Sequence, residues 1–263
     1  MIGMMGPMNP WSTGGIAVHV ESIAQKLFTE QGIRVVTPGG KSETTSSGTI
    51  PVRVVRDFRP RPLPPIESIP EVLAAVRFLH KADILHSHDA RLSSVASLLR
   101  KPLVTTFHGY LPREFLANGG TQGFRHRLYE DSVVSSIARS DVCIAVDERI
   151  AAWLREEYAA SPICIPNGVD SDMFRPNGEE QAYLPTILVA KHFARKCGIE
   201  YVVRAMPEIL RYVPDAVLIL TGPGGEEANI LRIIRDLELT RSVFVHGKIP
   251  HDEMPGVIAR AWV

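Results

Sequence analysis

The stretch DILHSHDARLSSVASLLRKPLVTTFHG, residues 83–109, decides the fold class of this chain. Asp83–His86 and Leu103–Phe107 are short apolar runs typical of buried strands, and Leu92–Leu99 between them reads as a helix. A strand, a helix and a second strand in this order predict a right-handed crossover between parallel strands.

The same alternation extends from this stretch toward the N-terminus. Strands are predicted at Ile2–Met5, Ile33–Thr37 and Val52–Val55. Apolar residues at helical spacing predict helices over Ile16–Leu27 and Val72–Leu79. Two segments interrupt the pattern: Lys41–Gly48 is polar and is predicted to be a loop, and Arg59–Pro70 contains five prolines and is predicted to lack regular structure.

Toward the C-terminus the alternation continues, breaks and restarts. Before the break we expect helices at Arg125–Arg139 and Ile150–Tyr158 and strands at Val142–Val146 and Ile163–Ile165. Pro166–Pro185, rich in proline, glycine and charge, is the best domain boundary. After it we expect further strands and helices at Thr186–Ala190, Ile199–Tyr212, Ala216–Thr221, Ile230–Leu237, Val243–His246 and Met254–Ala261.

This pattern predicts an α/β protein with two Rossmann-like, doubly wound parallel-sheet domains. The expected divisions are an N-terminal domain over residues 1–172, a linker over 173–185 and a C-terminal domain over 186–263. Three strand–helix units are fewer than a mononucleotide-binding domain needs, and the chain ends on the apolar run Ala-Trp-Val. We therefore expect the second domain to be incomplete.

Composition narrows the functional classes. Lys plus Arg and Asp plus Glu both number 29, and this zero net charge argues against a general nucleic-acid binder. Three cysteines in no zinc or redox spacing fit a reducing compartment, so a cytoplasmic protein is expected. No signal peptide or apolar span is visible, and the Pro/Arg-rich Arg56–Arg61 is a faint indication of peripheral contact with the inner membrane face.

Candidate ligand-binding residues follow the predicted strands, because ligands of such sheets bind at the carboxyl ends of the strands. Gly14 and Gly15 open the first helix, where free N–H groups suit phosphate, although the alternative is a flexible loop with a helix cap. His108 follows Leu103–Phe107 and could hydrogen-bond a sugar or a phosphate. His86 and His88 flank another strand end and are interpreted as structural.

A cationic turn follows the strand Thr186–Ala190. Lys191, Arg195 and Lys196 could neutralise a departing diphosphate, and the alternative is a solvated charged turn. Gly222 begins a further loop where backbone can approach a ligand closely. No Asp-x-Asp pair is placed at a strand end, so no metal ligand is predicted.

In order along the chain, six segments resemble the retaining glycosyltransferases of family 4, also called group 1: Gly14-Gly15, Thr106-Phe-His-Gly109, Pro166-Asn-Gly-Val-Asp170, Lys191 to Lys196, Leu220-Thr-Gly-Pro-Gly224 and Val245-His-Gly-Lys-Ile-Pro250. The resemblance implies the GT-B fold and transfer of a sugar from a nucleotide-diphosphate sugar to an acceptor hydroxyl with retained configuration. It also implies a sugar or lipid-linked acceptor and no cofactor.

By this resemblance His108 would contact the transferring sugar, and Lys191 and Lys196 would stabilise the diphosphate in place of a metal. Gly14, Gly15 and Gly222 would complete the donor site. In the family the first basic position is usually Arg rather than Lys, and its two-glutamate motif would lie beyond Val263. Two alternatives stay open: a nucleotide-sugar epimerase of the same fold, and a truncated non-catalytic remnant that binds nucleotide.

Overall fold

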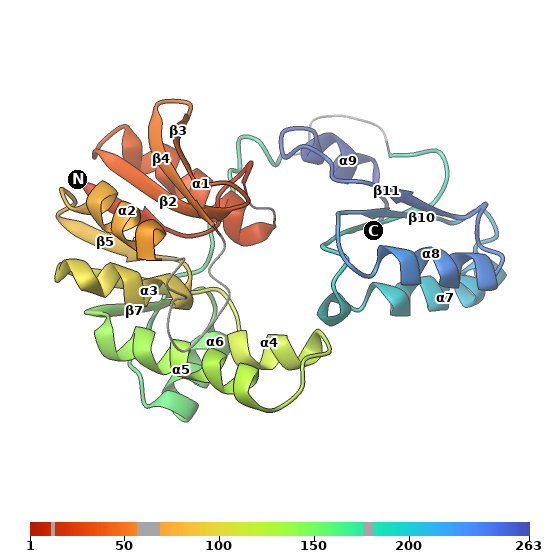
Figure 1. Cartoon of the computed structure of the whole chain (residues 1–263). Helices are drawn as coiled ribbons and strands as arrows, with labels where there is room; N and C mark the ends of the chain where they lie inside the picture. Colours follow the sequence, from red (N-terminus) through yellow and green to blue (C-terminus); the bar gives the residue numbers. More distant parts are fainter. Residues whose placement is uncertain (12–13, 57–68, 176–180) are drawn as a thin grey trace. The chain divides into compact units, whose positions relative to one another are not determined.

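The chain folds into two compact units, each with its own sheet (Figure 1). The computed structural model describes residues 1–11, 14–56, 69–175 and 181–263. The larger unit comprises Met1–Leu116 and Gly120–Asn167, and the smaller unit comprises Ala117–Gly119 and Gly168–Val263. The bounds expected from composition, 1–172, 173–185 and 186–263, stay a prediction.

The larger unit is built on an eight-stranded sheet in the order β3-β4-β2-β1-β5-β6-β7-β8. The strands are β1 (Ile2–Met5), β2 (Ile33–Gly39), β3 (Glu43–Ser47), β4 (Ile50–Arg56), β5 (Ile84–Ser87), β6 (Leu103–Phe107), β7 (Val142–Ala145) and β8 (Ile163–Cys164). Neighbouring strands are parallel except β3 and β4, which are antiparallel. The chain therefore places β2 on one side of β1 and β5 on the other side, so the direction in which strands are added reverses at β1.

Helices cover both faces of this sheet. On one face α1 (Gly15–Phe28) packs in a cluster with Met4, Val35 and Val54. On the other, α2 (Ile69–Leu79), α3 (Ala90–Ala96) and the 3-10 helix η2 (Ser97–Leu99) pack with Met5, Val36 and Val55. Successive residues of one strand thus enter opposite clusters, which is why each of these strands carries apolar residues at neighbouring positions.

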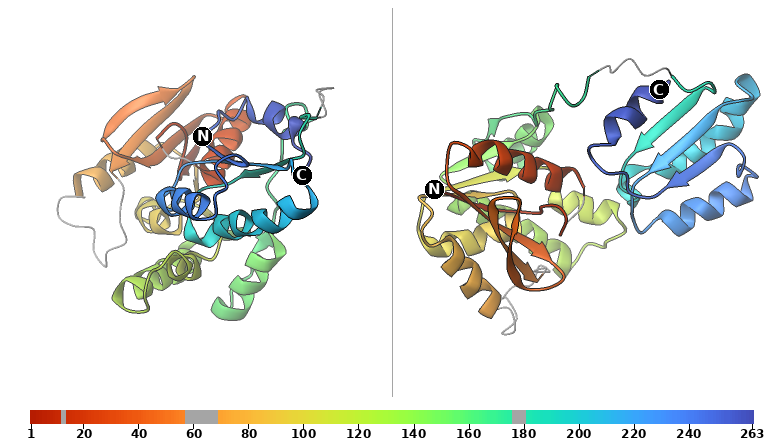
Figure 2. Two further views of the ribbon diagram at one scale, coloured as in Figure 1. Left: turned by 90° about the vertical axis from the view of Figure 1, so that its right-hand side faces the viewer. Right: turned by 90° about the horizontal axis from the view of Figure 1, so that it is seen from above.

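A third cluster closes the β7 side of the sheet. It joins Phe107 and Ala145 to residues of α5 (Phe124–Arg139) and α6 (Glu148–Tyr158). Trp153 of α6 is 3% exposed and lies between Tyr110 and Tyr158. The doubly wound arrangement predicted for this part of the chain is confirmed, and Figure 2 shows helices on both sides of the sheet.

The structure corrects three details of the expected elements. Lys41–Gly48 contains β3, which pairs with β4 as an exposed edge strand and is therefore polar. The helix α4 (Leu111–Ala117) was not expected, because its seven residues are too few to show a helical repeat. Most of Arg59–Pro70 lies outside the described residues, but α2 already begins at Ile69, since the first turn of a helix tolerates Pro70.

The smaller unit has a parallel three-stranded sheet in the order β11-β10-β9. Its strands are β9 (Thr186–Ala190), β10 (Val217–Thr221) and β11 (Val243–His246), and its helices are η3 (Arg195–Cys197), α7 (Ile199–Tyr212), α8 (Glu227–Asp236) and α9 (Met254–Arg260). A single core cluster joins the sheet to α7 and α8 around Phe193, which is 0% exposed. Across the parts of the chain that the structure describes, no helix combines the length and hydropathy needed to cross a membrane.

The separate cores predict that the larger unit folds by itself. A fragment of residues 1–167 contains all of its three clusters, so we expect one cooperative urea transition. Fluorescence of the buried Trp153 and far-UV circular dichroism should report the same midpoint. A fragment that lacks a cooperative transition would show that its core needs the rest of the chain.

Candidate functional site

The strand order of the larger unit changes direction between β1 and β5. In open parallel sheets, the loops that leave two such strands diverge and form a ligand-binding crevice at the carboxyl edge. Here the β1 loop begins with Gly6 and the β5 loop with His88, whose N–H donates to Met5 O at 2.7 Å. A Cβ on Gly6 would lie 2.8 Å from the His88 Cβ, so only glycine lets the two loops approach this closely.

Four histidines gather at this edge and form what we call the histidine cluster. His19 comes from α1, His86 and His88 from β5 and the residue after it, and His108 from the residue after β6. His88 Nδ1 lies 3.1 Å from His108 Nε2, and one of the two nitrogens donates. His19 packs edge-on against both rings, with centroids 5.3 Å from His88 and 4.8 Å from His108.

His86 occupies a supporting position in the cluster. Its Nε2 lies 2.8 Å from Thr106 Oγ1 on β6, and its ring centroid is 4.1 Å from that of His88. His88 is 3% exposed, and its Nε2 is buried without a hydrogen-bond partner among the described residues. The cluster is thus a packed layer of imidazoles rather than a set of surface side chains.

Burial keeps these imidazoles neutral. Desolvation lowers the pKa of His86 to about 4 and that of His108 to about 3, and repulsion from His19 adds to both effects. The nearby Asp89 carboxylate opposes the shift at His108. Burial also moves the pKa of His88 well below its usual value and lowers that of His19. At neutral pH the site therefore offers uncharged hydrogen-bonding groups, which suit hydroxyls better than phosphates.

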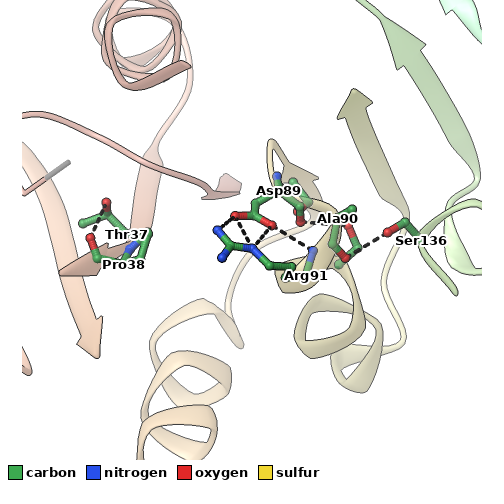
Figure 3. A network of polar contacts seen from close by, with 8 residues as sticks. Thr37, Pro38, Asp89, Ala90, Arg91 and Ser136 are labelled. Carbon is green, nitrogen blue, oxygen red and sulfur yellow. Dashed lines mark hydrogen bonds and ion pairs between the residues drawn. The ribbon is translucent and has the colours of Figure 1, made fainter. Parts of the chain in front are cut away.

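The residue after His88 anchors the β5 loop (Figure 3). Asp89 caps α3, since its Oδ1 accepts from the Arg91 N–H at 2.8 Å, and its carboxylate also pairs with the Arg91 guanidinium. Ser136 Oγ of α5 donates to Ala90 O at 2.9 Å, which ties the start of α3 to the neighbouring helix. These contacts fix the loop that carries His88.

Gly14 and Gly15 lie at the start of α1, on the same chain segment as His19. Gly14 has φ 110°, a conformation that favours glycine, and a Cβ on either residue would meet no atom within 4 Å. No side-chain cap is observed for α1 among the described residues. The first-turn N–H groups of α1 are the kind that can receive an anion.

In the smaller unit, backbone contacts lock two loops together. In the loop after β9, Lys191 N–H donates to Thr221 O at 3.0 Å, and Phe193 N–H donates to Pro223 O at 2.9 Å. From the loop after β10, Glu226 N–H donates to Phe193 O at 2.9 Å. A Cβ on Gly222, where φ is 137°, would overlap the carbonyl oxygen of Lys191. Phe193, buried in the core, anchors this pair of loops.

The locked loop presents three cations, which we call the basic loop: Lys191, Arg195 and Lys196. All three side chains are exposed, and the last two lie on η3. A cavity of about 320 Å³ lies beside η3 and is lined by Ala194, Arg195, Ile199, Glu200, Glu226, Asn229 and Ile230. Of the predicted donor residues, Gly222 lies directly against the main chain of Lys191, and Lys196 lies on η3 of the same loop.

The structure also shows what sequence reasoning missed. The interpretation of His86 and His88 as structural stays a prediction, but the sequence does not reveal that His88 touches His108. His19 received no role, because it is one polar residue inside a helical pattern. The motif His86-Ser-His88 after an apolar run was the available signal, since both side chains follow a strand toward its carboxyl end.

Comparison with known proteins identifies the family. The sequence profile of "Glycosyltransferase Family 4" matches residues 13–173, which is more than half of the chain. The chain belongs to glycosyltransferase family 4. The profile of "Glycosyl transferases group 1" matches residues 170–263 of this family 4 chain. The recognition made from the six sequence segments is confirmed.

One curated relative and two solved structures illustrate the similarity of this family 4 chain to known proteins. Phosphatidyl-myo-inositol mannosyltransferase of Mycobacterium tuberculosis H37Rv is 26% identical over 253 residues, which cover 88% of this chain and 62% of that protein. Sucrose-phosphate synthase from Thermosynechococcus elongatus superposes with a TM-score of 0.79 at 20% identity, over 99% of this chain and 74% of that one. The structure of Anabaena Alr3699/HepE in complex with UDP and glucose superposes with a TM-score of 0.73 at 16% identity. The superposition covers 98% of this chain and 72% of that one.

The chain spans less than two thirds of the curated mannosyltransferase that it matches. The solved structures support the predicted GT-B fold class. Both matching profiles and the curated relative are glycosyltransferases, so the epimerase alternative receives no support.

The buried histidines predict acid sensitivity of the folded state. In an unfolded chain a histidine titrates near pH 6.5, whereas His86 and His108 stay neutral in the fold to about pH 4 and about pH 3. Unfolding therefore takes up protons below pH 6.5, and the free energy of unfolding should fall as the pH drops from 7.5 to 5. The slope approaches about 1.4 kcal/mol per pH unit for each fully linked histidine.

Urea denaturation across this pH range, in chelator-treated buffer, measures the effect. His86→Asn should reduce the slope, because Asn does not titrate. His80→Asn, at an exposed histidine of the same unit, serves as the control and should keep the wild-type slope. Equal slopes for wild type and His86→Asn would contradict the buried neutral state of His86.

The interlocked loops predict a sharp difference between neighbouring glycines. Gly222→Ala would force a Cβ onto the Lys191 carbonyl at positive φ, so it should lower the free energy of unfolding by about 1–3 kcal/mol. Gly225→Ala is the matched control, since a Cβ there meets no atom within 4 Å, and it should change stability by less than about 0.5 kcal/mol. Chemical denaturation that ranks the two variants equally would contradict the interlock.

Proposed function

We propose that this chain acts as a glycosyltransferase that transfers a hexosyl group from a nucleotide-diphosphate sugar to an acceptor hydroxyl, with retained anomeric configuration and without a metal ion. In the reaction the bond between the anomeric carbon and the diphosphate oxygen breaks, the acceptor oxygen bonds to the same face of the sugar, and the proton of the acceptor hydroxyl passes to the departing diphosphate. The diphosphate leaves with the negative charge that this cleavage develops.

The basic loop is the observation that carries this proposal. Three exposed cations stand at the carboxyl edge of β9 on a loop that backbone contacts hold in place. Preorganised charges of this kind stabilise a transition state because they need no rearrangement when charge develops. Lys191 and Lys196 are therefore assigned to the departing diphosphate, with Gly222 holding Lys191 in position.

The histidine cluster suits the sugar side of the reaction. His108 is neutral at pH 7 and follows β6, beside His88 at the end of β5, so it can exchange hydrogen bonds with a sugar hydroxyl. Gly14 and Gly15 leave open space at the start of α1, where the anionic part of a donor can approach the backbone. We assign His108 as the catalytic residue that contacts the sugar.

We infer the class of acceptor from the name of the curated relative. That protein is named for mannosyl transfer to phosphatidyl-myo-inositol, a lipid. We propose a polyol or lipid-linked acceptor for this chain, presented at the inner face of a membrane with which the protein associates peripherally. Proton NMR of the product's anomeric coupling tests retention, and turnover in excess EDTA tests metal independence.

The basic loop leads to a kinetic prediction for the full-length protein. Lys191→Ala and Lys196→Ala should each lower turnover about a hundred- to a thousand-fold, which corresponds to about 3–4 kcal/mol, because the lost cation acts mainly in the transition state. Lys191→Arg should keep or improve turnover, since the guanidinium fork fits phosphate oxygens. Steady-state kinetics with a matched donor and acceptor measure all three variants.

A control separates catalysis from surface charge. Arg204→Ala removes an exposed cation from α7 in the same unit and should leave turnover near wild type. Near-normal turnover of both lysine-to-alanine variants would mean that the basic loop is a solvated turn, and the proposed role of the diphosphate site would fail.

A further inference from the structure

Three histidines of the cluster have the arrangement of a metal-ligand set. His19, His88 and His108 each offer a ring nitrogen, and the three nitrogens lie within 4.8 Å of one another. The ligands come from α1, the β5 loop and the β6 loop, so the fold brings together residues that are far apart in the sequence. His86 is outside this set, because its Nε2 is engaged with Thr106.

The spacing is close to what a tetrahedral ion requires. Zinc binds imidazole nitrogens at about 2.0–2.1 Å, which places two ligand nitrogens about 3.3 Å apart. His88 Nδ1 and His108 Nε2 are already 3.1 Å apart. His19 is half-buried on a helix surface, so a change of its rotamer can complete the set without moving the backbone.

The chemistry of the three groups selects the ion. A set of three imidazoles without a carboxylate suits Zn²⁺, Cu²⁺ or Ni²⁺ and not Mg²⁺ or Ca²⁺, which prefer oxygen ligands. Three ligands leave a fourth position for water, as in open zinc sites.

The hydrogen bonding within the histidine cluster also favours a bound cation. His88 Nδ1 and His108 Nε2 face each other, and only one shared proton can join them. A bound cation would engage two facing lone pairs at once, which the single shared proton cannot do.

We propose that His19, His88 and His108 form a binding site for a first-row transition metal, with Zn²⁺ as the ion of choice. The site lies on the larger unit and is distinct from the diphosphate site of the basic loop. Because the ion takes the nitrogen of His108, zinc and the sugar compete for this residue, and zinc inhibits transfer. The inhibition rests on the proposed function, whereas the binding does not.

Binding is tested first, without any activity measurement. The full-length protein is treated with EDTA, exchanged into chelator-free buffer and titrated with ZnCl₂ by calorimetry, and Co²⁺ absorption reports tetrahedral nitrogen coordination. One ion per chain is expected. His19→Ala should weaken binding at least tenfold, since it removes a ligand from a half-buried position where the fold tolerates the change, and circular dichroism verifies folding.

The control variant is His80→Ala, which removes an exposed histidine of the same unit and should bind zinc as the wild type does. Absence of one-to-one binding in the wild type, or equal affinity of wild type and His19→Ala, overturns the site. Inhibition is then measured for each protein relative to its own metal-free rate. Zinc should inhibit the wild type, and EDTA should restore its activity. His19→Ala should be at least tenfold less sensitive to zinc. Tight binding without inhibition would overturn the proposed competition at His108 but not the metal site itself.

Discussion

The parallel pairing of β1 with both β2 and β5 is the constraint on which the larger unit depends. In the sheet, all strands from β4 across β1 to β8 therefore point the same way, and the loops that follow them begin at the same edge. The reversal of strand order beside β1 places the loops after β1 and β5 where the strand order changes direction. Residues as distant in sequence as His19 and His108 meet because of this topology rather than through any local signal.

Much of the fold could be predicted from the sequence, because short, mainly apolar runs and apolar residues at helical spacing are visible within single segments. The bounds of β6, β9, β11 and α7 follow directly from such runs and from helical spacing. The edge strand β3 could not be predicted this way. Its side chains are mostly exposed, and its stability comes from pairing with β4, so its polar sequence resembles that of a loop.

The candidate site was predictable in part, for a related reason. His108 and Lys191 directly follow strands, and the position after a strand is visible in the sequence. The partnership of His88 with His108 depends on β5 lying beside β6, and the approach of His19 depends on how α1 crosses the sheet. The overlap that Gly222 avoids with Lys191 is likewise a relation between two loops, which no single segment contains.

The interlock of the smaller unit has a consequence for how such a protein can diverge. Hydrogen bonds between main-chain atoms and close glycine contacts hold the loop after β9, while the buried Phe193 fixes it to the core. The side chains of Lys191, Arg195 and Lys196 on that loop are exposed. Evolution, or an engineer seeking a different donor, can exchange these side chains while the main chain keeps its shape, but Gly222 and Gly224 admit almost no replacement, because a Cβ there would overlap main-chain atoms.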